Sequence, residues 1–536
     1  MSTSSENIRE VDVAIVGGLF ALCVLSGSLT YIVIGGPTGL FTGLLLHRLG
    51  VSVCILDAKA GSLDLGRADA LNARTQQYLE VAGLLDELLP LGLKCNTSST
   101  FADGEFKSRQ NKWWVGIEHA LHKNFLMIGQ PVIEAMLNSR LKGLVYHGQD
   151  VVNVAEDEEH VHVTTSTGFK VRSKYLLAAD GARSFVRNAL GIDFTGTKPE
   201  MLWAVLDTFI ESDFPVCPEI ITFQAHGQSR VSWIPRERGL SRFYVLLEGE
   251  VSQKRAEESI KKHMAPHSVE FKQTEWYSTF DVKERIASSF ISKNGNGRVL
   301  LAGDAAHVHS VNGGQGLNTG LSDAFALAWR LAMVTKHDLP EAASKKLIQS
   351  YDLERRTTAK NVIDVAAALV RDTMREAKEY VATIERNAGY ITGMGVSYEG
   401  LNSPLVKESS YSFWTAGARC PDVVVTGSEQ PGPSWLYSHV EYGKFIVLSI
   451  GQVPHPYMKY QHVLQFISIF ASPPEGSNNP AQGEDRDTHS LSGKMFRADW
   501  VLPEDNYIIV IRPDMYIGYI ATCEQGWQDY IASICV

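Results

Sequence analysis

The sequence predicts a multidomain protein of the mixed α/β class, and three observations support this. Apolar strand segments at 11–16, 51–56, 175–179 and 299–302 each stop at a glycine or an aspartate, as buried parallel strands often do. Between 201 and 290 the pattern changes to long alternating strands, which is typical of a separate antiparallel sheet. The length of 536 residues is enough for two or three domains.

Composition and charge narrow the classes of function. Hydrophobic residues make up 44 % of the chain and charged residues 21 %, as in ordinary globular proteins. A net charge of −10 and the lack of a basic run argue against a nucleic-acid surface. The seven cysteines are scattered without a C-x-x-C pair, so neither a metal site nor a dithiol centre is indicated. Their odd number fits a reducing compartment, and we expect a cytoplasmic protein.

The most informative stretch is 298–324. Its apolar strand stops at Gly303 and Asp304, a glycine-rich turn follows at 313–316, and a helix with apolar residues at helical spacing comes next. A carboxylate at a strand end can hold ribose or ribityl hydroxyls, and free N–H groups at a helix start favour negative charge. Glycines also let a flat ring lie against the backbone. Together these features suit a flavin.

The segments GDAAH and GGQGLNTGLSDA within this stretch resemble the second FAD motif of the flavoprotein aromatic hydroxylases (group A flavoprotein monooxygenases), in particular the phenol hydroxylase-like branch. One departure is Val311, where such proteins usually have proline beside the reactive edge of the flavin. The resemblance implies six cofactor-binding residues in this stretch: Gly303, Asp304, Gly314, Gly316, Leu317 and Asn318.

The resemblance also implies the domain organisation. Residues 1–195 form the first part of a Rossmann-like FAD-binding domain of the p-hydroxybenzoate hydroxylase type, and 291–400 form its second part with long helices. Residues 196–290 form a β-sheet substrate domain. Residues 401–536 resemble the thioredoxin-like C-terminal domain of that family. This domain serves assembly there, so a homodimer is one expected form of the protein.

The dinucleotide-binding fingerprint near the N-terminus is interrupted. The G-x-G-x-x-G pattern must follow the first strand directly, and Gly17 and Gly18 begin it there. Seventeen apolar and small residues, 19–35, then intervene. The pattern resumes at three cofactor-binding candidates: Gly36, Pro37 and Gly39.

Three interpretations of this insert stay open. The first is a translated intron or gene-model error. The second is a real insertion in which 31–34 replaces the first strand. The third is a membrane anchor, because the stretch 13–46 carries no charged residue and is long enough to span a bilayer. We favour the first, since removing 19–35 restores a complete fingerprint, and we expect no membrane partner. The interruption also supports an alternative in which the protein is a flavin-free inactive homologue or an interaction protein.

Further cofactor-binding candidates lie outside these two motifs. Asp57 ends the second strand about 20 residues beyond Gly36, the spacing at which a carboxylate meets the adenosine ribose. The resemblance adds Arg74, Gln130 and the pair Asp180 and Gly181. Near that pair, Arg183 and Arg187 supply charges that a phosphate would need.

Three residues are candidates for catalysis. Asp69 stands where the family has an acid that faces the substrate phenol, although aspartate is also a good helix N-cap. Arg242 and Tyr244 alternate with Phe243 and so share one face of a strand, and this R-F-Y resembles a substrate-facing segment of the family. Phe280 stands where the family has a tyrosine, so one polar contact is absent.

The resemblance implies an FAD-dependent monooxygenase that hydroxylates a phenolic small molecule with NADPH and dioxygen through a flavin C4a-hydroperoxide. In that reaction Asp69 acts as the base or orients one, and Tyr244 shares the hydrogen bond to the phenol oxygen. Arg242 favours the phenolate electrostatically. Epoxidation, Baeyer–Villiger insertion and dearomatisation are alternatives within the same fold.

Overall fold

The computed structural model describes residues 8–17, 21–25, 28–32, 36–112, 117, 120–199, 201–215, 219–225, 228–249, 251–310, 313–372, 377–427, 432–452, 454, 458–473 and 493–535. The chain forms two compact units. The first contains Met1–Leu79, Leu84–Leu331 and Arg355–Gly395, and the second Glu80–Gly83, Ala332–Glu354 and Val396–Val536. The four domain ranges drawn from the sequence stay a prediction.

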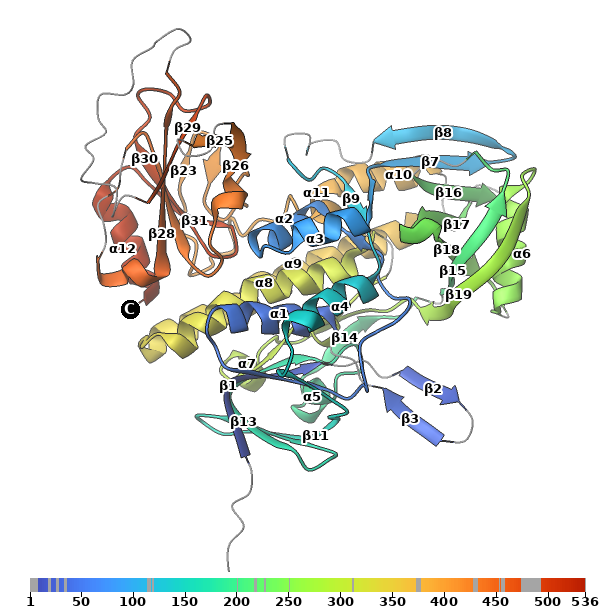
Figure 1. Ribbon diagram of the computed structural model, residues 1–536, viewed down its shortest axis with the longest axis horizontal. Coiled ribbons are helices and arrows are strands. Elements are labelled where there is room, and N and C mark those ends of the chain that lie inside the picture. The colour runs from blue at the N-terminus through green and yellow to red at the C-terminus, as the bar shows by residue number, and fades with distance from the viewer. Residues whose placement is uncertain are drawn as a thin grey trace, which may run out of the picture. The chain divides into compact units, whose positions relative to one another are not determined.

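A largely parallel sheet lies at the centre of the first unit. Its strands follow the order β10-β4-β1-β13-β12-β11, and β21 pairs with β13. Their bounds are Val145–His147, Val53–Asp57, Ile8–Gly17, Lys170–Ala179, Val161–Thr165, Val151–Glu156 and Val299–Leu301. Gly17 at the end of β1 lies opposite both Asp57 and Ala179. The carboxyl ends of β4, β1, β13 and β21 therefore share one edge of the sheet. Figure 1 labels β1, β13 and β11 of this sheet.

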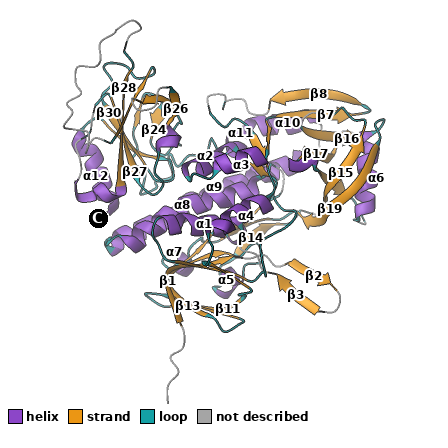
Figure 2. Ribbon diagram, in the orientation of Figure 1, coloured by secondary structure: helices purple, strands orange, loops and turns teal. Residues whose placement is uncertain are grey.

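Helices cover this sheet and carry two of the motifs. Helix α1 (Pro37–Arg48) is buried through its first ten residues, as expected for a helix apolar on all sides, and it packs against α4 (Gln130–Arg140) (Figure 2). Helix α8 (Gln315–Lys336) begins just after the glycine-rich turn. Helix α9 (Glu341–Asp372) follows it along the chain. Both long helices have residues in each of the two units.

The insert forms a hairpin apart from this sheet. Strands β2 (Ala21–Leu25) and β3 (Ser28–Ile32) pair with each other in antiparallel register, and among the described strands neither joins another sheet. Because β1 occupies the place between β4 and β13, the interpretation in which 31–34 replaces the first strand is wrong. Within the described ranges, no helix combines the length and apolar character needed to cross a membrane.

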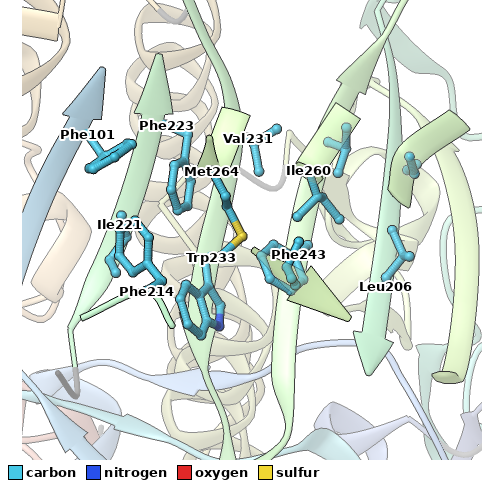
Figure 3. Close-up of a cluster of buried hydrophobic side chains, with 14 residues drawn as sticks. Phe101, Leu206, Phe214, Ile221, Phe223, Val231, Trp233, Phe243, Ile260 and Met264 are labelled. Atoms are coloured by element: carbon cyan, nitrogen blue, oxygen red, sulfur yellow. The ribbon is translucent and has the colours of Figure 1, made fainter. Parts of the chain in front are cut away.

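The second sheet of the first unit has the strand order β19-β15-β18-β17-β16-β7-β8. The bounds are Val269–Asp281, Leu202–Ser212, Ser241–Leu247, Gln228–Pro235, Ile220–Ala225, Thr97–Ala102 and Glu105–Lys112. Helix α6 (Gln253–Met264) covers one face, where the rings of Trp233 and Phe243 stack at 5.5 Å (Figure 3). Side chains alternate along a strand, so Arg242 and Tyr244 point from β18 to the opposite face.

Shorter elements complete the first unit. Those that the argument uses are β5 (Ala70–Leu71), α2 (Ala73–Val81), α5 (Phe185–Ala189) and α11 (Ala388–Thr392). The others are α3 (Leu85–Leu88), β6 (Leu93–Cys95), β9 (Phe125–Met127), β14 (Phe194–Thr197), β20 (Glu284–Ala287), α7 (Ser292–Gly295), β22 (His307–Val308) and α10 (Ala377–Arg386).

The second unit contains a sheet in the order β26-β25-β29-β28-β27-β30-β31 with helix α12 (Glu524–Cys535). The strand bounds are Pro433–Trp435, Val424–Gly427, Lys494–Ala498, Leu464–Ala471, Phe445–Ile450, Tyr507–Ile511 and Ile517–Ala521, and a small hairpin joins β23 (Ser410–Tyr411) to β24 (Trp414–Thr415). Its turn after β30 is held by Arg512, whose guanidinium is buried between Glu354 and Asp514 at 2.6–2.7 Å.

Candidate active site

The carboxyl edge of the parallel sheet collects the predicted cofactor residues. Gly17 ends β1, Asp57 ends β4, and Asp180 follows β13. Gly303 and Asp304 follow β21 in the same way. Sequence segments that lie far apart in the chain therefore meet along one edge. Gly18 and Val311 lie outside the described residues.

The start of α1 packs against the turn after β21. A Cβ atom at Gly303 would lie 2.8 Å from the Thr38 hydroxyl, and one at Gly320 would collide with the same oxygen, so a side chain at either position would displace Thr38. Gly303 also has a φ of +59°, which favours glycine. Among the described residues, no side chain caps α1, and a Cβ at Gly36 would meet nothing within 4 Å. The first N–H groups of a helix suit a dinucleotide phosphate, so this helix start fits FAD.

Asp180 offers a second feature that fits the cofactor. Its buried carboxylate accepts the N–H of Val186 on Oδ2 at 3.1 Å, and Oδ1 has no hydrogen-bond partner among the described residues. Burial raises the pKa of Asp180. Gly181 adopts a φ of +79°, the left-handed region that favours glycine. An acceptor without a partner at this edge suits a cofactor hydroxyl.

The guanidinium of Arg187, predicted as a phosphate ligand, contacts protein groups, and its role at a phosphate stays a prediction. Its guanidinium donates to the carbonyls of Ala305 at 2.9 Å and Ala182 at 3.0 Å and lies 3.8 Å from the centre of the Phe194 ring. It thereby ties the loop after β13 to the turn after β21. The side chain of Arg183 is exposed.

Asn318 also contacts protein groups. Its Oδ1 accepts the N–H of Asn72 at 2.9 Å, and its Nδ2 donates to the carbonyls of Ala70 at 3.0 Å and Gly314 at 2.7 Å. These bonds occupy both donor hydrogens of the amide, so its side chain fixes the glycine-rich turn to β5. Leu317 beside it is buried.

Gln130 holds the segment that carries Asp69, and Arg74 is buried in the helix that follows it. Gln130 accepts the N–H of Ala68 on Oε1 at 3.3 Å and donates to Glu134 at 2.7 Å. Arg74 in α2 is buried, and its Nη1 donates to Gln77 at 2.8 Å. The binding of FAD by both residues stays a prediction, and the contact of Gln130 fixes the loop that precedes Asp69.

The three catalytic candidates meet in one cluster. Asp69 Oδ2 lies 3.3 Å from Nη1 of Arg242 and 3.5 Å from the Tyr244 hydroxyl, the second distance being at the outer limit of a hydrogen bond. Burial raises the pKa of Tyr244 far above its usual range, and the charge of Asp69 adds to this. Burial lowers the pKa of Arg242, but Asp69 and Asp207 outweigh it and hold the pKa well above its ordinary value.

Sequence reasoning missed Asp207, which pairs with Arg242 through both carboxylate oxygens. Arg236 approaches the same carboxylate at 3.5 Å and is itself paired with Glu237 at 2.7 Å. A signal was present, because Asp207 is the one charge in the apolar run LWAVLDTFI, and a buried charge requires a partner. Phe280 packs against Tyr244 with ring centres 6.4 Å apart.

Arg67 was also missed and lies between the two halves of the site. Its backbone carbonyl accepts a hydrogen bond from Arg242, and its φ is +70°. Burial lowers the pKa of its guanidinium, while the charges of Asp304 and Glu134 oppose that shift. Arg67 therefore contacts the catalytic cluster through its backbone, and its guanidinium charge interacts with Asp304 of the flavin motif.

Asp323, within the flavin motif, fixes the turn that carries Asp304. Its Oδ2 accepts the N–H of Gly303 at 3.0 Å and contacts Nε2 of His307 at 2.8 Å, while its Oδ1 accepts from Arg355 at 2.8 Å. Burial raises the pKa of Asp323, but the charges of Arg355 and His307 and these hydrogen bonds bring it below its ordinary value.

A family model described as an FAD binding domain matches residues 28–366. The chain belongs to this family of FAD-dependent aromatic hydroxylases. The match starts in the hairpin and leaves out β1, so the family pattern breaks where the sequence is interrupted. A mixed α/β fold with an FAD-binding domain, as predicted, is thereby confirmed.

Individual relatives agree with this membership. A FAD-dependent monooxygenase of Aspergillus terreus is 32 % identical over 384 residues, which are 63 % of this chain and 52 % of that protein. A phenol 2-monooxygenase of Aspergillus fumigatus is 24 % identical and matches 91 % of this chain and 93 % of its own length. The chain thus spans about half the length of the first of these curated relatives and nearly all of the second.

A solved structure of aklavinone-11 hydroxylase with FAD and aklavinone is similar in fold. The TM-score is 0.73 at 19 % identity, and the match covers 99 % of both chains. At this identity the similarity concerns the fold alone.

Proposed function

We propose that this protein is a monooxygenase that hydroxylates a phenolic small molecule with NADPH and dioxygen. The observation that carries the proposal is the buried cluster of Asp69, Tyr244 and Arg242, which the backbone carbonyl of Arg67 also contacts. The name of the phenol 2-monooxygenase that matches 91 % of the chain supports a phenolic substrate. Bound FAD supplies the activation of dioxygen in this reaction.

The residues of the cluster have separate tasks in this proposal. Asp69 accepts the phenol proton on its carboxylate, which raises the electron density of the ring. Tyr244 stays a neutral hydroxyl because its pKa is raised, so it can donate a hydrogen bond to the phenolate oxygen. Arg242 contributes a fixed positive charge that stabilises the phenolate.

The burial of the cluster supports a water-poor site. Arg242 is 0 % exposed, Asp207 2 % and Asp69 6 %. Exclusion of water strengthens the interaction between Arg242 and a phenolate. It also limits side reactions of reactive intermediates with water.

For the second unit we propose a thioredoxin-like fold that serves assembly. The parallel strands β27 and β28 with the antiparallel strands β30 and β31 and the C-terminal helix α12 support it. The sequence contains no C-x-x-C pair, which argues for assembly rather than dithiol chemistry.

The test of the proposed function starts with purified full-length protein. We expect a yellow protein with flavin absorbance, NADPH oxidation that phenols accelerate, and products heavier by one oxygen in mass spectrometry. A colourless protein that binds no added FAD would favour the flavin-free alternative. A yellow protein whose product carries the oxygen in an epoxide or lactone would favour the other oxygenations.

A further inference from the structure

Trp203 lies on the same face of the second sheet as the catalytic cluster. It belongs to β15, in which Val205 lies directly opposite Tyr244 of β18. Residues opposite each other in an antiparallel pair point to the same face, and so do residues two apart along one strand. Trp203 therefore stands on the face of Tyr244, about 7 Å farther along the sheet.

The indole N–H is the unusual feature of this position. Trp203 is 4 % exposed, and its Nε1 is shielded from solvent and has no hydrogen-bond partner among the described residues. A buried indole N–H normally donates a hydrogen bond. Because this group can donate but not accept, it needs an acceptor that the described part of the chain does not supply.

The surroundings of the indole decide what kind of acceptor fits. Trp203 packs in a buried apolar cluster whose other members are Leu246, Val282 and Val370. The rings of Tyr244 and Phe280 pack against this apolar cluster and are only partly buried. The described side chains of the cluster would not balance the charge of a carboxylate, whereas a neutral carbonyl oxygen carries no charge to balance.

We propose that Trp203 donates its indole N–H to a neutral carbonyl oxygen of the substrate. The substrate is then a phenol that carries an acyl group or a ring carbonyl. This inference rests on the proposed function, because Tyr244 holds the phenol oxygen at the other end of the molecule. Two polar contacts at opposite ends fix the orientation of the aromatic ring, and Trp203 is thus a specificity-determining residue.

The test measures the binding of paired ligands to the full-length protein with FAD, in the absence of NADPH. Each pair is a hydroxyphenyl ketone and the alkylphenol of the same chain length, with the substituent meta or para to the hydroxyl. A hydroxybenzoate is the anionic comparison. The change in flavin absorbance on titration gives a Kd for each ligand. Because the ratio of the two Kd values compares ligands on one protein, a general loss of affinity cancels.

Three variants are compared with the wild type. Trp203→Phe keeps an aromatic ring and removes the N–H, and Trp203→His restores a ring N–H. The matched control is Trp233→Phe, because Trp233 lies in the same sheet but on the opposite face, where its ring stacks on Phe243 (Figure 3).

We expect the wild type to favour the ketone of at least one pair, and Trp203→Phe to reduce that preference about tenfold, roughly the value of one hydrogen bond. Trp203→His should recover part of it, and Trp233→Phe should keep it. Hydroxylation of both ligands by the wild type, with the same preference in Trp203→Phe, would overturn the inference and leave the proposed function intact. A preference for the hydroxybenzoate that depends on Trp203 would overturn the neutral carbonyl. Failure of the wild type to bind or hydroxylate any phenol would remove both proposals.

Discussion

Asp207 and Arg242 form a buried ion pair in which two parallel hydrogen bonds of 2.6 Å join the carboxylate to the guanidinium. The pair fixes the guanidinium so that Nη1 faces Asp69 and Tyr244. The position of the positive charge that we propose to stabilise a phenolate therefore depends on Asp207, which is itself buried.

The first prediction concerns this pair. In Asp207→Asn the charge of Arg242 stays buried, and only one of its two neighbouring carboxylates, Asp69, remains. We expect the free energy of unfolding to fall by about 3–5 kcal/mol. Denaturant unfolding measures the loss. Glu275→Gln is the control, since it breaks an ion pair with the exposed Arg238 and should cost at most about 1 kcal/mol. Equal effects of the two variants would contradict the role of Asp207.

The second prediction concerns flavin retention. Asp304 stands at the end of β21 where the ribityl chain should lie, so Asp304→Ala should remove an acceptor for its hydroxyls and yield protein without bound flavin. The ratio of flavin absorbance to protein absorbance measures this. Asp281→Ala, at an exposed ion pair with Lys198, should keep the wild-type ratio. Fully flavinated Asp304→Ala protein would show that the carboxylate does not hold the cofactor.

The third prediction concerns acid stability. Burial lowers the pKa of His309 to about 4, against an ordinary value near 6.5. Between these values the unfolded chain binds a proton that the native protein does not, so stability falls as the pH decreases from about 6.5 to about 4. His309→Asn should lose less stability over this range in unfolding experiments, and His47→Asn, at an exposed site, should match the wild type. Parallel curves for wild type and His309→Asn would refute the assignment.

The fourth prediction concerns the insert. We infer that 19–35 interrupts a fingerprint whose halves, Gly17 at the end of β1 and Gly36 before α1, belong together. A dinucleotide phosphate must approach the backbone closely at this turn. Deletion of 19–35 should raise both the soluble yield and the flavin content per chain, and mature transcripts should lack the segment. Equal flavin content with and without it, or transcripts that uniformly retain it, would argue against a gene-model error.

The sequence predicted the strand ends well because each buried strand is a continuous apolar run that stops at a glycine or aspartate, as at Asp57 and Asp180. It also placed Asp69 and Tyr244 on one site through the family resemblance. It missed Asp207 and Arg67 because their roles depend on contacts between residues far apart in the chain. The contacts of the Asn318 amide with protein groups could not be read from the sequence, and its place at the cofactor stays a prediction.

The fifth prediction concerns Asp69 as the base. Asp69→Asn and Tyr244→Phe should keep FAD and still oxidise NADPH, but form hydroxylated product more slowly, by about 10²–10⁴-fold for Asp69→Asn. Raising the pH so that the phenol ionises in solution should restore part of the loss in Asp69→Asn, because the substrate then arrives without the proton. Wild-type product rates in both variants would contradict the roles given to them.

The central claim, that this chain inserts one oxygen atom from dioxygen into a phenolic ring, is tested most directly by isotope labelling. The purified full-length protein is supplied with NADPH and a phenol that accelerates its NADPH oxidation, under dioxygen enriched in the heavy isotope of oxygen. Mass spectrometry then compares the product with that formed under ordinary dioxygen. We predict a product that gains a single labelled oxygen on the ring in the wild type. Unlabelled product, or NADPH oxidation without any oxygenated product for every phenol tested, would contradict the claim.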